Sequence, residues 1–287
     1  MRKLLKYEMR AMNRRLFPVY IGMLAIALLN YLFGFGRIMR GSDSLTLEWG
    51  ESLPNVLFML ISTMQALITA LFFGLMAGMM VVWLMTTLNR FRKGLLGEEG
   101  YLMFTLPVTT GRLVGAKLLA ASIHLLLSCA VALLSFCILL GIPELFRLLF
   151  ELDWSTAFRN LGSVIPSWPL MVLELIALFI LSTFSSILQF YLAMALGHLS
   201  NRHRTLLSVI AYIGISAALS MLASLFFGSL SLLDTSGLFD AIYRFCANQP
   251  HLVAHAVLLG FLVVTLLEGA LFWFPTRYIL KNRLNLE

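Results

Sequence analysis

Six long runs of apolar residues alternate with short polar segments along this chain. A helix of about 20 consecutive apolar residues crosses the hydrocarbon core of a bilayer, which is about 30 Å thick. On that measure the predicted spans cover roughly residues 17–36, 56–88, 113–140, 169–196, 205–228 and 252–274. We therefore predict an all-α, polytopic membrane protein with six transmembrane helices in a single domain of residues 1–287.

The composition supports this class. Of the 287 residues, 60% are hydrophobic and 12% are charged, whereas soluble domains carry about 25% charged residues. The mean hydropathy is +0.90. The net charge of +7 would suit nucleic acid, but the basic residues lie in short flanks of the apolar runs and form no basic domain. We expect contact with membrane lipids and none with nucleic acid.

The distribution of basic residues predicts the orientation. Of the 21 lysines and arginines, 16 fall before the first span, around the segment between the second and third, after the fourth, or after the sixth. The other five fall in the alternate loops. Cytoplasmic loops carry an excess of Lys and Arg, so we expect both termini in the cytoplasm.

Two segments outside the spans have apolar residues at helical spacing. Residues 1–15 place Leu5, Met9 and Met12 on one face and lysines and arginines on another, which is typical of an amphipathic helix on the membrane surface. Residues 141–168 show a similar pattern and predict a short external helix lying at the interface.

The cytoplasmic loop at 89–112, within the segment Asn89–Lys117, is the polar segment with the most ordered pattern. Acidic residues lead into an apolar run that a proline ends, which predicts a short helix there. Its residues are Glu98, Glu99, Gly100, Tyr101, Leu102, Phe104, Leu106 and Pro107. An acidic and apolar helix on the cytoplasmic face suggests a docking surface for a soluble partner.

Polar residues within the fourth span fall on one face. Glu174, Ser182, Ser185 and Gln189 cluster within about 80 degrees of arc at 100 degrees per residue. A charged carboxylate within the bilayer is costly, so Glu174 should face protein or water, or be protonated. The stripe either lines a substrate route or forms hydrogen bonds between helices.

Small residues form two further stripes, each repeating every four residues. One runs along the second span and the other along the fifth, and both allow close approach of helix backbones. Their members are Ala70, Gly74 and Gly78, and Ser216, Ser220 and Ser224. Each stripe is either a dimer seam or a packing surface within one subunit.

Cysteine and histidine spacing gives no metal site. The three cysteines form no C-x-x-C pair, and we interpret them as packing residues. His251 and His255 are spaced i, i+4, but no carboxylate completes a His-Glu-x-x-His pattern, so we interpret them as interfacial histidines. His124, alone in the third span, is expected to be a hydrogen-bonded packing residue.

Two short stretches of the sequence resemble enzyme motifs but lack residues that those motifs require. Gly111–Lys117 lacks the Gly-Lys pair and the following Ser or Thr of a phosphate-binding loop. The adjacent Glu98 and Glu99 resemble the Glu-Glu-x-x-x-Arg signature of CAAX-type membrane proteases, but position 103 is Met.

The run Phe91–Lys117, FRKGLLGEEGYLMFTLPVTTGRLVGAK, resembles the cytoplasmic loop of permease subunits of ABC-2-type transporters, particularly those of Gram-positive bacteria. The ending Tyr278–Glu287, YILKNRLNLE, is similar to the ending of the same proteins. Tyr101 stands where many members of the wider family carry Thr.

This resemblance implies a noncatalytic permease subunit, mostly of exporters, in the bacterial cytoplasmic membrane. It implies a pair of permeases, formed with a second copy or a related chain, and two separate ABC ATPase subunits. ATP and magnesium would be bound by those ATPases and no cofactor by this chain. Residues 98–106 would be the coupling helix that enters a groove on each ATPase. The alternative from the residues alone is a membrane scaffold or sensor that docks a different partner, with an intramembrane protease as a third interpretation.

Overall fold

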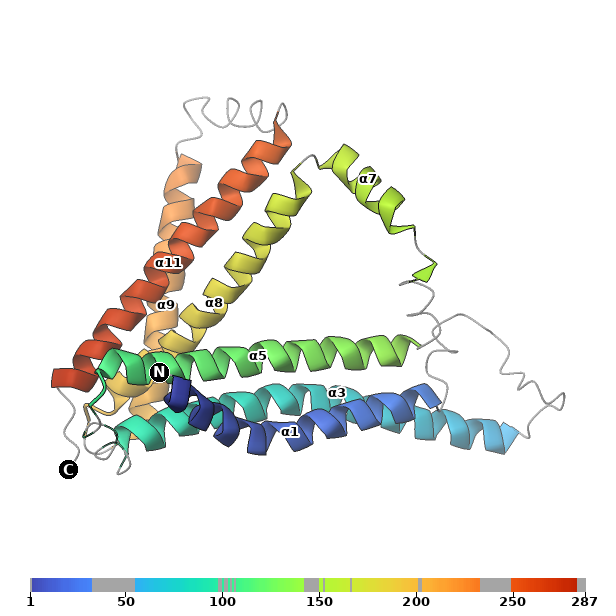
Figure 1. Cartoon of the computed structure of the whole chain (residues 1–287), viewed down its shortest axis with the longest axis horizontal. Helices are drawn as coiled ribbons and strands as arrows, with labels where there is room; N and C mark the ends of the chain where they lie inside the picture. The colour runs from blue at the N-terminus through green and yellow to red at the C-terminus, as the bar shows by residue number, and fades with distance from the viewer. Residues whose placement is uncertain are drawn as a thin grey trace. The chain divides into compact units, whose positions relative to one another are not determined.

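The computed structural model describes residues 2–32, 55–97, 100, 103, 105, 107–141, 150–151, 153–165, 167–200, 203–232 and 249–282. These residues form seven α-helices and one π-helical turn (Figure 1). The α-helices are α1 (Arg2–Leu32), α3 (Asn55–Phe91), α5 (Thr110–Leu140), α7 (Trp154–Val164), α8 (Trp168–Gly197), α9 (Arg204–Leu232) and α11 (Pro250–Asn282), and the π-helical turn is Arg92–Leu96.

Six of these helices are long and apolar enough to cross a membrane: α1, α3, α5, α8, α9 and α11. The six spans predicted from the hydrophobic runs are therefore confirmed as apolar helices, and the chain is a polytopic membrane protein. The short helix expected within residues 141–168 is present as α7. The cytoplasmic placement of both termini stays a prediction.

The first helix differs from the expectation. The sequence suggested a surface helix at 1–15 followed by a separate span at 17–36, whereas α1 runs without a break from Arg2 to Leu32 and includes Pro18. The physical reason is a single buried stripe that continues past residue 16. Its members recur every three or four residues: Glu8, Met12, Leu16, Tyr20, Met23, Ala27 and Asn30. Residues at this spacing share one helix face.

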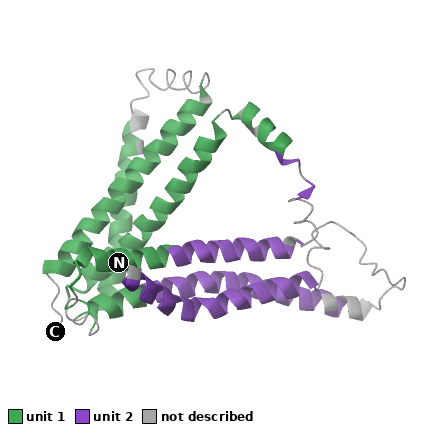
Figure 2. Ribbon diagram, in the orientation of Figure 1, with its two compact units in different colours: residues 1, 88–122, 155–287 green, residues 2–87, 123–154 purple. Residues whose placement is uncertain are grey.

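The chain divides into two compact units (Figure 2). One unit comprises residues 2–87 and 123–154, and its core joins three helices. Met23 and Ala27 of α1 pack with Phe72 of α3 and Leu139 of α5, and all four are buried. Half-buried aliphatic side chains from the same helices surround this cluster.

Hydrogen bonds between α1 and α5 accompany this core. The hydroxyl of Tyr20 lies 2.8 Å from Ser128 Oγ and donates to the backbone oxygen of His124 at 3.2 Å. His124 Nε2 lies 3.2 Å from Asn13 Oδ1, as expected for a hydrogen-bonded packing histidine. These contacts satisfy polar groups on helices that have little water beside them.

The other unit comprises residues 1, 88–122 and 155–287, and within it α8 packs against both α9 and α11. The rings of Phe190 and Tyr212 stack between α8 and α9, with centroids 4.6 Å apart. At the end of α8, a Cβ atom on Gly197 would overlap the backbone of Ser208. The close approach of α8 and α9 at this end therefore requires glycine.

The two neighbouring phenylalanines of α3 test the packing in the core of α1, α3 and α5. Phe72 is fully buried, whereas Phe73 is 50% exposed. We expect Phe72→Ala to lower the free energy of unfolding by on the order of 2 kcal/mol, because it opens a cavity in the core. The value is lower than in a soluble protein, since burial against lipid-facing helices adds little hydrophobic free energy. Phe73→Ala is the matched control and should cost much less. Titration of both variants with SDS in mixed micelles measures the difference, and equal losses would contradict this account of the core.

Candidate functional site

The predicted docking segment lies mostly outside the described residues. This applies to Glu98, Glu99, Tyr101, Leu102, Phe104 and Leu106. Of the rest of the predicted set, Gly100 is buried and its amide donates to the backbone oxygen of Gly97 at 2.8 Å. Pro107 is exposed.

The helices that flank this segment make contacts close to it. Phe91, at the end of α3, stacks on Tyr191 of α8 with ring centroids 4.0 Å apart, and both rings are buried. Lys117, one to two turns into α5, donates from Nζ to the backbone oxygen of Arg90 at 3.2 Å. These contacts join α3 to α8 and α5 to α3 close to the helix ends that flank the segment.

Gly94 allows this attachment. A Cβ atom at this position would lie 2.7 Å from Lys117 Nζ, so any larger residue would displace the ammonium group. Lys117 itself is 5% exposed. The absence of a side chain at Gly94 therefore makes room for a buried cation at the base of the segment.

His198, directly after α8, adds a group that can titrate near neutral pH. Burial lowers the pKa of His198 from its ordinary value, and the positive charges of Arg204 and Arg92 lower it further. The neutral imidazole is therefore favoured in the folded protein. Sequence reasoning missed this residue, although Arg202 and Arg204 follow it closely in the sequence.

The polar stripe predicted on α8 has several different partners. Gln189 Nε2 donates to Ser216 Oγ on α9 at 2.8 Å, and Ser182 Oγ donates to a carbonyl of its own helix. Ser185 is buried, and no hydrogen-bond partner of its Oγ exists among the described residues. The contacts that the structure shows are thus within and between helices, and a substrate route along this face stays a prediction.

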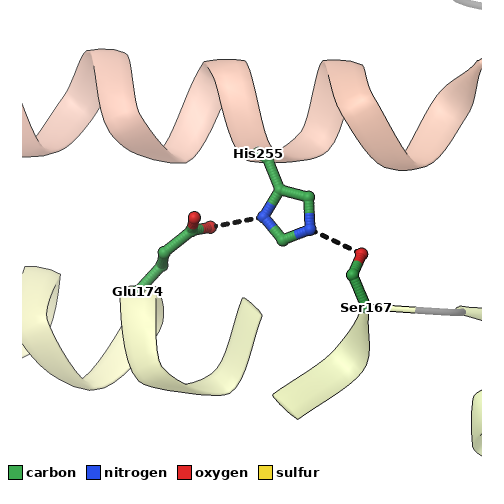
Figure 3. A network of polar contacts seen from close by, with 3 residues as sticks. All are labelled: Ser167, Glu174 and His255. Atoms are coloured by element: carbon green, nitrogen blue, oxygen red, sulfur yellow. Dashed lines mark hydrogen bonds and ion pairs between the residues drawn. The ribbon is translucent and has the colours of Figure 1, made fainter. Parts of the chain in front are cut away.

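Glu174 of the stripe belongs to a linked set of three side chains. His255 Nδ1 on α11 lies 2.8 Å from Glu174 Oε2, and His255 Nε2 lies 2.6 Å from Ser167 Oγ (Figure 3). The side chains of His255 and Glu174 are 12% and 7% exposed. We call this set the Ser167–His255–Glu174 clamp, because it ties the start of α8 to α11.

The clamp uses a residue that would ordinarily cap a helix. Ser167 is the N-cap of α8, but its side chain makes no capping hydrogen bond. Pro169, in the first turn, has no N–H to offer. The hydroxyl of Ser167 is therefore available to His255. In the tautomer of His255 that carries its proton on Nδ1, that nitrogen donates to the carboxylate of Glu174 and Ser167 donates to Nε2.

The order serine, histidine, carboxylate is also the order that activates a serine nucleophile. Such chemistry needs backbone N–H groups aimed at the developing oxyanion. Beside Ser167, the amide of Trp168 already donates to the backbone oxygen of Ile165, and Pro169 has no N–H. The amide of Met171 donates to the backbone oxygen of Ser167. The contacts that the structure shows make the set a link between the start of α8 and α11.

Sequence interpretation treated His255 as an interfacial histidine and missed its carboxylate partner. One signal could have found it. Glu174 is the seventh residue of α8 and His255 the sixth of α11, so two parallel helices place them at matching depth. No cluster of three or more metal-ligating side chains occurs within the described part of the chain.

The small-residue stripes differ from each other. Ala70 and Gly74 are exposed, and no described atom lies within 4 Å of a Cβ built on Gly74 or Gly78. On α9, Ser216 is the partner of Gln189, whereas Ser220 and Ser224 are exposed and Ser224 bonds only within its helix. Packing within the subunit thus accounts for Ser216.

The clamp can be tested by a double-mutant cycle. His255→Ala leaves the buried Glu174 without its partner, which should lower the free energy of unfolding by roughly 1–3 kcal/mol. Glu174→Ala should also destabilise, and the double variant should lose clearly less than the sum of the two. His251→Ala, one turn away at an exposed position, is the control. Additive losses in thermal unfolding would show that the pair does not interact.

The lowered pKa of His198 predicts a pH dependence of stability. The unfolded chain binds a proton at a higher pH than the folded one, so stability should be unaffected above about pH 7 and should fall as pH drops below the ordinary histidine pKa of about 6.5. His198→Gln should reduce this fall, and His203→Gln, at an exposed position nearby, should not. Melting temperatures between pH 5 and 8 measure it, and identical profiles for the wild type and His198→Gln would contradict it.

No protein-family model, no curated protein sequence and no solved structure matches this chain.

Proposed function

We propose that this chain is the membrane-spanning permease subunit of an ATP-driven, ABC-2-type transporter, acting in export. Residues 98–106 would be its coupling helix, docked on separate ATPase subunits. Support comes from the six apolar helices and from the resemblance of Phe91–Lys117 to the cytoplasmic loop of such permeases.

The observation that carries the proposal is that the helices flanking the segment are joined to each other and to α8. Phe91 stacks on Tyr191, and Lys117 bonds to the backbone of Arg90. A force applied to the segment by a partner would therefore reach α3, α5 and α8 together. A loop with free ends would absorb such a displacement instead.

The chemistry of the segment suits a protein groove. Tyr101, Phe104 and Leu106 would supply apolar and aromatic anchors, and Glu98 and Glu99 would pair with basic residues of the ATPase. ATP and magnesium would be held by the partner chains, and this chain would take no part in hydrolysis.

The complete assembly in this proposal has two permease chains and two ATPases in the bacterial cytoplasmic membrane, with the termini on the cytoplasmic side. The second permease is a second copy or a related chain. ATP-driven closure of the ATPases would move the helices that flank each segment and change the side from which substrate is accessible.

Co-purification from native membranes in a mild detergent tests the docking role. The wild type should retain an ATPase with a phosphate-binding loop in about equimolar amount, as one permease binds one ATPase in the proposed assembly. Glu98→Lys with Tyr101→Ala should remove it, because the changes reverse a charge and delete an anchor. Mass spectrometry and ATPase assays of the eluates measure both.

The matched control carries the same chemical changes at exposed positions elsewhere, Glu151→Lys with Tyr7→Ala, and should keep the partner. Recovery of a soluble protein that binds no nucleotide would favour the scaffold or sensor interpretation. A wild-type chain that elutes alone would refute the transporter proposal.

A further inference from the structure

The helix α7 has two chemically different faces. Phe158 lies one turn after Trp154 on one side, and these aromatic side chains are 46% and 40% exposed. The opposite side is polar and comprises Ser155, Thr156, Arg159, Asn160 and Ser163. A helix with this division buries its aromatic face in an apolar medium and keeps its polar face in water.

The place of α7 relative to the start of α8 is fixed by local contacts. The rings of Phe158 and Trp168 stack in parallel, with centroids 5.1 Å apart. Between the helices the amide of Trp168 donates to Ile165, and Ser167 is held by His255 through the clamp. The aromatic face of α7 therefore continues onto the first residue of an apolar span.

The length of α8 indicates how deep in the bilayer its contact with α7 lies. α8 has 30 residues, which gives about 45 Å at 1.5 Å per residue, whereas the hydrocarbon core is about 30 Å thick. The ends of α8 thus extend into the headgroup regions. Trp168 is the first residue of α8, and tryptophan is enriched at the level of the headgroups. Phe158 of α7 stacks on this residue, so α7 contacts α8 at the headgroup level.

We propose that α7 is a lipid-binding helix that lies in the membrane interface, with Phe158 toward the acyl chains and Arg159 at the level of the lipid phosphates. Arg159 is the one charged residue of α7, so the helix attracts anionic headgroups. This inference does not depend on the transport proposal.

Spin labels on single cysteines test the inference. Cys129, Cys137 and Cys246 are replaced by alanine, and labels are placed at Thr156, Phe158, Leu161 or Ser163. The protein is reconstituted in vesicles of phosphatidylethanolamine and phosphatidylglycerol. Labels at 158 and 161 should collide more with oxygen than with a water-soluble nickel chelate, and labels at 156 and 163 should show the reverse. The label at 158 replaces Phe158 itself, whereas the label at 161 leaves Phe158 in place. Agreement between the two positions therefore shows that the result does not come from the loss of Phe158.

Two results would overturn the inference. High nickel accessibility at all four positions would place α7 in water. Low accessibility to both reagents at 158 and 161 would show that this face is covered by protein, as in a contact with a second copy. The Trp168→Ala variant adds a readout of the stack, and it should reduce the oxygen preference at 161 if the stack positions α7.

Discussion

The scarcity of water inside a bilayer is the constraint on which this structure depends. Polar side chains on an apolar helix gain from a partner within the protein, and several helix pairs that the structure shows are joined where such groups meet. Tyr20 and Ser128 join α1 to α5, Gln189 and Ser216 join α8 to α9, and His255 and Glu174 join α8 to α11. Because lipid competes with apolar side chains for the same surfaces, these hydrogen bonds define which helix faces belong together.

The same constraint explains why contacts that join the helices occur together with large exposed apolar surfaces. Large apolar side chains along α9 and α11 are exposed on their own unit, as expected for helices in lipid. The attachments lie at particular levels: the clamp near the start of α8, and the contacts of Phe91 and Lys117 near the ends of α3 and α5 that flank the docking segment. The helix α8 is thus held to α11 near its start and to the end of α3 by the ring of Tyr191.

The sequence was sufficient for the coarse architecture, since hydropathy over about 20 residues measures the property that selects transmembrane helices. It was insufficient for α1, where a patterned surface helix and the following span share one buried stripe and fuse. It also indicated that Glu174 needs a polar environment but not that His255 provides it, because the partner lies on another helix and the pairing depends on the depth of both. The stacks of Phe91 on Tyr191 and of Phe158 on Trp168 likewise depend on tertiary placement.

The continuity of α1 has a mechanical consequence. A helix of 31 residues extends for about 46 Å, and its buried stripe continues on both sides of Pro18. A rotation of a few degrees about its middle would move its two ends by one to two ångströms in opposite directions. Through such a rotation the first helix would relate the position of its charged first half to the packing of α3 and α5 around Met23 and Ala27.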